Sequence, residues 1–167
     1  ILPAAFSLLI ASEGQSQDNY QFDETTLNLS NGKIARKIEI RNDSVFTSGL
    51  FLEGRSLNYL GKESPEFKFI ADGKQISSLT GWKLKGTYPV ADDYQGKGAV
   101  IKLTGTGAAE GIEVAVTYLM YEKLPLIRKH LSFTNRSGSD IKLEAVDNEA
   151  LNLNFDYVAT WVYHNYA

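Results

Sequence analysis

The chain has 167 residues, a formal net charge of −3, 43% hydrophobic residues and 22% charged residues. This is enough for one globular domain with its own core, and the mild negative charge gives no electrostatic reason to expect a nucleic acid as partner. Cysteine is absent, which excludes disulfides, thiolate nucleophiles and cysteine-based metal sites. With only two histidines a histidine-rich metal site is not expected either, and we expect no cofactor.

The chain begins with an apolar run, ILPAAFSLLIAS, which ends in small residues and precedes the polar segment EGQSQDN. This order is typical of the hydrophobic region and cleavage zone of a secretory signal. The run is too short to span a bilayer, and a buried terminal strand or helix is the alternative interpretation. We expect residues 1–18 to be a signal-peptide remnant and linker, residues 19–167 to form the domain, and the protein to be periplasmic or secreted.

In the first half of the domain, alternating apolar and polar residues predict strands, because successive side chains of a strand point to opposite faces. The expected strands are residues 26–30, 34–40, 45–52, 66–70 and 81–88. Arg36 interrupts the apolar side of the second strand, so we expect its inner face to begin at Ile38. Trp82 shares its side with Leu84 and is expected in the core.

Short polar segments between these strands predict turns. Asn31-Gly32 predicts a type I′ hairpin turn, which needs positive φ at both central residues. Asn42-Asp43-Ser44 and Asp72-Gly73 have the composition of further turns.

The second half of the domain repeats the pattern. The expected strands are residues 99–104, 112–121, 127–134, 141–146 and 151–155, with an exposed loop over residues 89–98. Roughly ten to twelve strands at intervals near a dozen residues, without helical periodicity, predict an all-β fold. Since each strand has one apolar face, we expect an antiparallel β-sandwich or supersandwich with little helix.

The glycine-rich segment GTGAAEG, residues 105–111, is similar in composition to a phosphate-binding loop. Such loops lie between a strand and a helix, whose N-terminal amides meet the phosphate. Here a predicted strand follows instead. We therefore expect a hairpin connection.

Few residues suggest catalysis. Asp92-Asp93 lies in a polar loop, and Asp147 and Glu149 follow a strand; solvated edge or turn positions explain them better than a catalytic carboxylate pair. A sugar-epimerising pair of His130 or His164 with Glu149 is conceivable, but pairing across strands cannot be read from one sequence. We assign no catalytic residue.

The basic triplet Arg128-Lys129-His130 lies within a predicted strand. Arg128 and His130 share one side, and Ile127, Leu131 and Phe133 share the other with Lys129 as the exception. A solvated or domain-facing surface explains most of this pattern, so we interpret the triplet as structural.

The C-terminal segment YVATWVYHNY places Tyr157, Trp161, Tyr163 and His164 close together, with Tyr166 following. Aromatic rings stack on the C–H faces of sugars, and neighbouring polar groups then bind hydroxyls. The same residues also suit docking against a further domain or a local core. These three interpretations stay open, and the four residues are the candidate site of the chain.

Residues 96–151, about a third of the chain, resemble the N-terminal β-sandwich of glycoside hydrolases such as the family 36 α-galactosidases. The matching features are the strand IEVAVTY at residues 112–118, Tyr121, Pro125, the run Ile127-Arg128-Lys129, the segment FTN at 133–135, and residues 146–151. Sandwiches of the galactose mutarotase-like group share this style of sequence.

The resemblance implies an antiparallel supersandwich that precedes a catalytic (β/α)8 barrel in an exported carbohydrate-degrading enzyme. In that family both catalytic aspartates come from the barrel, and no segment here alternates strands with helices as a barrel does. The expectation is a non-catalytic domain that packs against a catalytic domain absent from this chain. The alternatives are a stand-alone module that binds an oligosaccharide or polysaccharide through the C-terminal aromatics, and a mutarotase-like epimerase.

Overall fold

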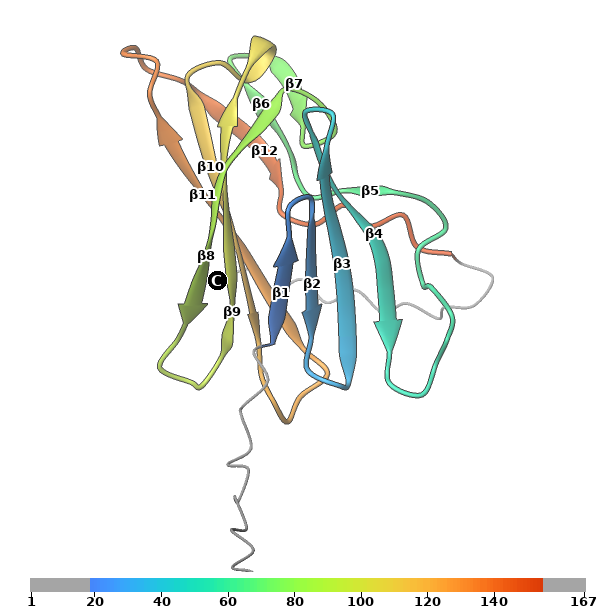
Figure 1. Ribbon diagram of the computed structural model, residues 1–167. Coiled ribbons are helices and arrows are strands. Elements are labelled where there is room, and N and C mark those ends of the chain that lie inside the picture. The colour runs from blue at the N-terminus through green and yellow to red at the C-terminus, as the bar shows by residue number, and fades with distance from the viewer. Residues whose placement is uncertain (1–18, 155–167) are drawn as a thin grey trace, which may run out of the picture.

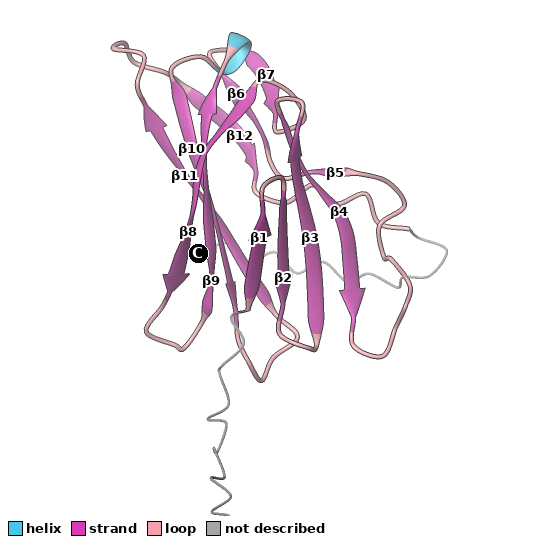
Figure 2. Ribbon diagram, in the orientation of Figure 1, coloured by secondary structure: helices cyan, strands magenta, loops and turns pink. Residues whose placement is uncertain are grey.

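The computed structural model describes residues 19–154, and the regular secondary structure of this part of the chain consists almost entirely of antiparallel strands (Figures 1 and 2). The strands are β1 (Tyr20–Asp23), β2 (Thr26–Ser30), β3 (Ile34–Arg41), β4 (Ser44–Leu52), β5 (Ser64–Pro65), β6 (Lys68–Ala71), β7 (Lys74–Ser77), β8 (Trp82–Ala91), β9 (Lys97–Gly105), β10 (Ile112–Met120), β11 (Ile127–Asn135) and β12 (Leu143–Asp147). The predicted all-β class is confirmed. Within the described residues, no helix has the length and apolar character that crossing a membrane requires.

The strands form three sheets. One contains β1 to β5 in sequence order, a second has the order β11-β10-β9-β8, and a smaller third has the order β12-β6-β7. Figure 1 shows the first two sheets side by side, with the third at their upper end. This arrangement is consistent with a β-sandwich.

The core lies between the sheets and is filled by the inward side chains of most strands, whereas β12 is largely exposed. Its fully buried side chains include Leu27 and Ile38 from the first sheet and Ile101 from the second. Phe67 packs edge-on against Trp82, with ring centroids 5.1 Å apart, and links the smaller sheet to β8. The expected core position of Trp82 is confirmed, because only 1% of the residue is exposed.

Two of the three predicted turns have positive φ at both central residues, as primed hairpin turns require. Asn42 and Asp43 adopt φ values of 51° and 59° between the paired residues Arg41 and Ser44. The Asp72-Gly73 turn, with φ values of 48° and 75°, is likewise as the composition indicates. The type I′ prediction for Asn31-Gly32 is wrong, since only Gly32 has positive φ there.

Asn31 shapes its connection in another way. Its side-chain oxygen accepts hydrogen bonds from the amides of Lys33 and Ile34, 3.0 and 3.1 Å away. Its amide nitrogen donates to the carbonyls of Tyr121 and Leu124, at 2.8 and 2.7 Å. A tertiary contact between two loops therefore sets the geometry of this connection, and the turn that the Asn-Gly dipeptide alone would favour does not form.

The strand boundaries differ from expectation at a few places. β8 continues to Ala91, so the loop expected over residues 89–98 begins at Asp92. Pro89 is tolerated inside the strand because β8 lies at a sheet edge and one side of it needs no hydrogen-bond donor. The strand expected at 151–155 is reduced, in its described part, to a bridge between Leu153 and Leu60. β1 and β7 are too short for the alternation to reveal them.

Segment 105–111 is a hairpin connection, as predicted. It joins β9 to β10 through one 3-10 turn at Gly107–Ala109, and a strand follows it. The segment therefore lacks the following helix that a phosphate-binding loop requires.

Candidate functional site

A buried ionic cluster joins the three sheets. Its centre is the Glu66 carboxylate, which lies between β5 and β6 and is fully buried. Arg36 of β3 approaches Glu66 Oε2 at 3.0 Å and Lys129 of β11 approaches the same oxygen at 2.9 Å. The side chains of Arg36 and Lys129 are only 3% and 4% exposed. Three charges from distant parts of the sequence are thus removed from water together.

Glu149, just after β12, completes the cluster from the partly exposed side. Arg36 binds both of its oxygens, with Nη1–Oε2 at 2.6 Å and Nη2–Oε1 at 2.9 Å. Lys129 Nζ lies 3.5 Å from Glu149 Oε1. Two cations therefore face two carboxylates, which makes the cluster neutral overall, and the bidentate arginine contact fixes its geometry.

Hydroxyl groups occupy the remaining positions around the centre. Thr47 of β4 and Tyr118 of β10 both donate hydrogen bonds to Glu66. Arg36 Nε in turn donates to Thr47 Oγ1 at 2.8 Å, and its guanidinium lies 5.4 Å from the centre of the Tyr118 ring. Both oxygens of Glu66 are consequently occupied by protein donors.

The cluster sets the ionisation of its members. Burial alone would raise the pKa of the Glu66 carboxyl, but Arg36 and Lys129, with the hydrogen bonds from Thr47 and Tyr118, lower it to about 2. Burial and the charge of Glu66 raise the pKa of the Tyr118 phenol well above its ordinary value. Burial lowers the pKa of Arg36, but Glu66, Tyr118 and Glu149 together raise it well above its ordinary value. These pKa values keep Glu66 ionised, Arg36 charged and the Tyr118 phenol neutral at neutral pH.

This arrangement is suited to holding the fold together. A general acid or base must exchange a proton near the working pH, and Glu66 is ionised far below it. Among residues 19–154, no group of three histidine, aspartate or glutamate side chains could hold a metal ion. The cluster thus connects the sheets through buried ion pairs and hydrogen bonds.

The two residues that broke the predicted alternation are the two cations of this cluster. Arg36 is buried on the inner side of β3, so the expectation that the inner face begins only at Ile38 is wrong. Lys129 points inward in the same way, whereas its neighbours Arg128 and His130 are exposed on the other side of β11. The structural interpretation of the basic triplet agrees with this geometry.

Glu149 was expected to be a solvated edge or turn residue, and its side chain is 38% exposed just after β12. The sequence analysis missed that two buried cations bind it. His130 does not meet it, because His130 points away from the side on which Lys129 contacts Glu149. The predicted site residues Tyr157, Trp161, Tyr163 and His164 lie outside the described residues, as does the segment 1–18.

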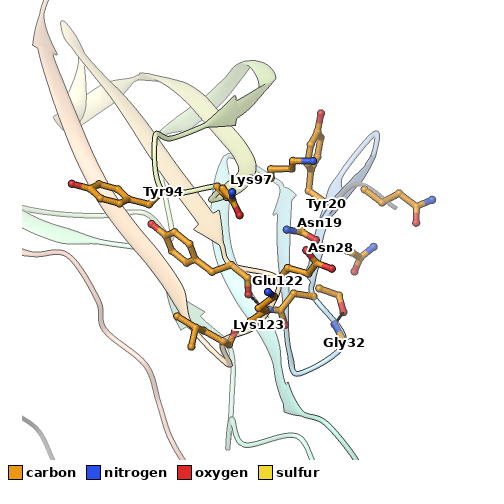
Figure 3. A pocket seen from close by; sticks show the side chains of 14 residues that line it. Asn19, Tyr20, Asn28, Gly32, Tyr94, Lys97, Glu122 and Lys123 are labelled. Carbon is orange, nitrogen blue, oxygen red and sulfur yellow. Dashed lines mark hydrogen bonds between the residues drawn. The ribbon is translucent and has the colours of Figure 1, made fainter. Parts of the chain in front are cut away.

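A second feature is an open cleft of about 900 Å³ at the end of the sandwich that is lowest in Figure 1. We call it the loop-end cleft. It is lined by Asn19, Tyr20, Gln21, Asn28, Ser30, Asn31, Gly32, Tyr94, Gln95, Lys97, Tyr121, Glu122, Lys123 and Leu124. Figure 3 shows Tyr94 toward one side, Tyr20 and Asn28 toward the other, and Lys97, Glu122 and Lys123 between them.

The loop that carries Tyr94 into this cleft is organised by Asp92. Asp92 Oδ1 accepts hydrogen bonds from the amides of Tyr94 and Gly96, at 3.0 and 2.7 Å. Asp92 Oδ2 accepts one from the Tyr121 hydroxyl at 2.7 Å. The Tyr121 hydrogen bond is the main reason that the pKa of Asp92 is lowered. The loop is therefore fixed, while the side chain of Tyr94 projects from it and the residue is 78% exposed.

Comparisons of the chain with protein-family models, with curated proteins and with solved structures gave no match.

Replacing Arg36 with methionine is expected to lower the free energy of unfolding by about 3–5 kcal/mol, because Glu66 would then be buried with only one cation. The matched control is Arg41→Met, which breaks an exposed pair with Glu63 of 2.8 Å and should cost at most about 1 kcal/mol. Urea denaturation of both variants measures the difference. Equal losses would show that the buried cluster contributes no more than a surface pair.

The lowered pKa of Glu66 also predicts a pH dependence. The stabilisation is fully present above the ordinary glutamate pKa of 4.5 and is lost as the pH falls through the folded-state value of about 2. The stability difference between the native protein and Glu66→Gln should therefore shrink by roughly 3 kcal/mol over that range. Denaturation at several pH values measures it, with the exposed Glu63→Gln as control. A difference that is independent of pH would contradict the assignment.

Proposed function

We propose that this chain is the non-catalytic N-terminal β-sandwich of an exported glycoside hydrolase of the α-galactosidase-like kind. Its role is to pack against a catalytic barrel that this chain does not contain. The resemblance of residues 96–151 suggests the family, and the all-β fold is compatible with it.

The observation that carries the proposal is the state of Glu66. A carboxylate that is buried with two cations and two hydroxyl donors has no free position for a substrate and no proton to give at neutral pH. Its function is to hold sheets in place. A domain whose one deeply buried carboxylate, among the described residues, is used in this way is well suited to be a scaffold.

A second observation concerns the segment that follows β12. Asn152 donates from its amide to Ser64 Oγ and from its side chain to the Glu63 carbonyl, both at 2.8 Å. Leu153 forms a bridge with Leu60, and Glu149 is bound by Arg36. The polypeptide is thus held against the sandwich up to the end of the described residues. Such anchoring supports a domain that orients what is attached to it.

A stand-alone carbohydrate-binding module is the second candidate, and the loop-end cleft favours it.

The mutarotase-like alternative gains no support from the described residues, because His130 and Glu149 lie on opposite sides of β11.

The proposal predicts that the isolated chain neither hydrolyses α-galactosides nor accelerates the interconversion of galactose anomers. Release of nitrophenol from a nitrophenyl α-galactoside and polarimetry of freshly dissolved galactose measure the two activities. An active α-galactosidase and an active mutarotase, assayed in parallel, serve as positive controls.

Turnover above the uncatalysed rate that purifies with the chain would contradict the proposal. The reading frame beyond Ala167 provides an independent test: it should encode alternating strands and helices of a barrel, and an immediate stop codon would contradict the assignment.

A further inference from the structure

We infer that the loop-end cleft is a binding site for a neutral oligosaccharide, with Tyr94 as its stacking platform. This site is distinct from the aromatic tail, and the inference goes beyond the proposed scaffold role. It rests on three features of the cleft: an exposed ring on a fixed loop, unpaired amide side chains, and nearly balanced charge.

The exposed ring is the first feature. Tyr94 is 78% exposed, and among the described residues only its backbone amide, not its side chain, forms a hydrogen bond with the fold. The loop beneath it is nevertheless held by three hydrogen bonds to the Asp92 carboxylate. Because the backbone under the ring is already fixed, a ligand that stacks on the ring has only the side chain of Tyr94 to order, and a tyrosine side chain has few rotatable bonds. The C–H face of a sugar ring is a suitable partner for such a surface.

The unpaired amides are the second feature. Among the described residues, the side-chain amides of Gln21, Asn28 and Gln95 form no hydrogen bond, although all three line the cleft. Each amide offers a donor and an acceptor, which is the combination that a sugar hydroxyl requires. By contrast, Asn31 has its amide nitrogen and oxygen committed to the two loops that it joins.

The charge is the third feature. The lining contains the cations Lys97 and Lys123 and the anion Glu122, so no strong field of one sign develops. A highly charged ligand is therefore not favoured. A peptide partner would need apolar anchors, and Leu124 is the one aliphatic side chain among the described residues that line the cleft. A polyhydroxylated, uncharged ligand fits this surface best.

The test uses the full chain and neutral oligosaccharides with α-galactosyl, α-mannosyl, β-glucosyl and β-xylosyl linkages. Binding is measured by titration calorimetry and mapped by amide chemical shifts. We expect at least one oligosaccharide to bind and to shift the amides of the 92–96 loop. Tyr94→Ala should weaken binding about fivefold or more, whereas Tyr94→Phe, which keeps the ring, should bind within about twofold of the native chain.

Tyr88→Ala is the matched control, because Tyr88 is an exposed tyrosine of β8 that does not line the cleft. It should leave the affinity unchanged. Binding that is equally weakened by both alanine variants, or shifts confined to residues far from the 92–96 loop, would overturn the inference. So would the absence of binding to every oligosaccharide. Since these measurements concern binding alone, their failure leaves the scaffold proposal standing, and turnover by the chain would leave the cleft inference standing.

Discussion

The fold depends on the neutralisation of one buried carboxylate. Glu66 is inaccessible to water, and an ionised group in that position is tolerated only when cations and hydrogen-bond donors surround it. The cations come from β3 of the first sheet and β11 of the second, and the hydroxyls from β4 and β10. Folding must therefore bring these four strands together in one arrangement. Glu149, just after β12, ties the end of the smaller sheet to the same point.

This constraint acts on register as much as on stability. A shift of β11 by one residue would turn Lys129 to solvent and carry His130 inward, so that Glu66 would lose a cation. The apolar residues of β11 would tolerate other partners more easily, because their contacts are less specific than an ion pair of fixed geometry. We infer that the cluster selects one pairing of the sheets, as polar groups in apolar cores do in other proteins. The apolar core then supplies most of the stabilisation.

The sequence allowed the strands to be predicted much better than the site. Alternation located most of β2, β3, β4, β9, β10 and β11, because these strands bury one face each. Arg36 and Lys129 were visible only as breaks in that alternation, and such a break does not show which residue the charged side chain contacts. Glu66 had no signal at all, since its partners are 30 and 63 residues away in sequence. A sequence pattern that would indicate such a cluster has two parts. Cations interrupt the apolar faces of two separate strands, and a single carboxylate precedes a third strand.

The most direct test of this account is the ionisation of Glu66 itself. Carbon-13 NMR of the glutamate side-chain carboxyl groups, assigned with Glu66→Gln, reports its titration in the folded protein. The account predicts that the Glu66 resonance stays at its ionised position down to the acid limit of the fold, near its pKa of about 2. A midpoint close to neutrality would contradict it, because the carboxyl would then be poised to exchange a proton and the cluster would be a reaction centre.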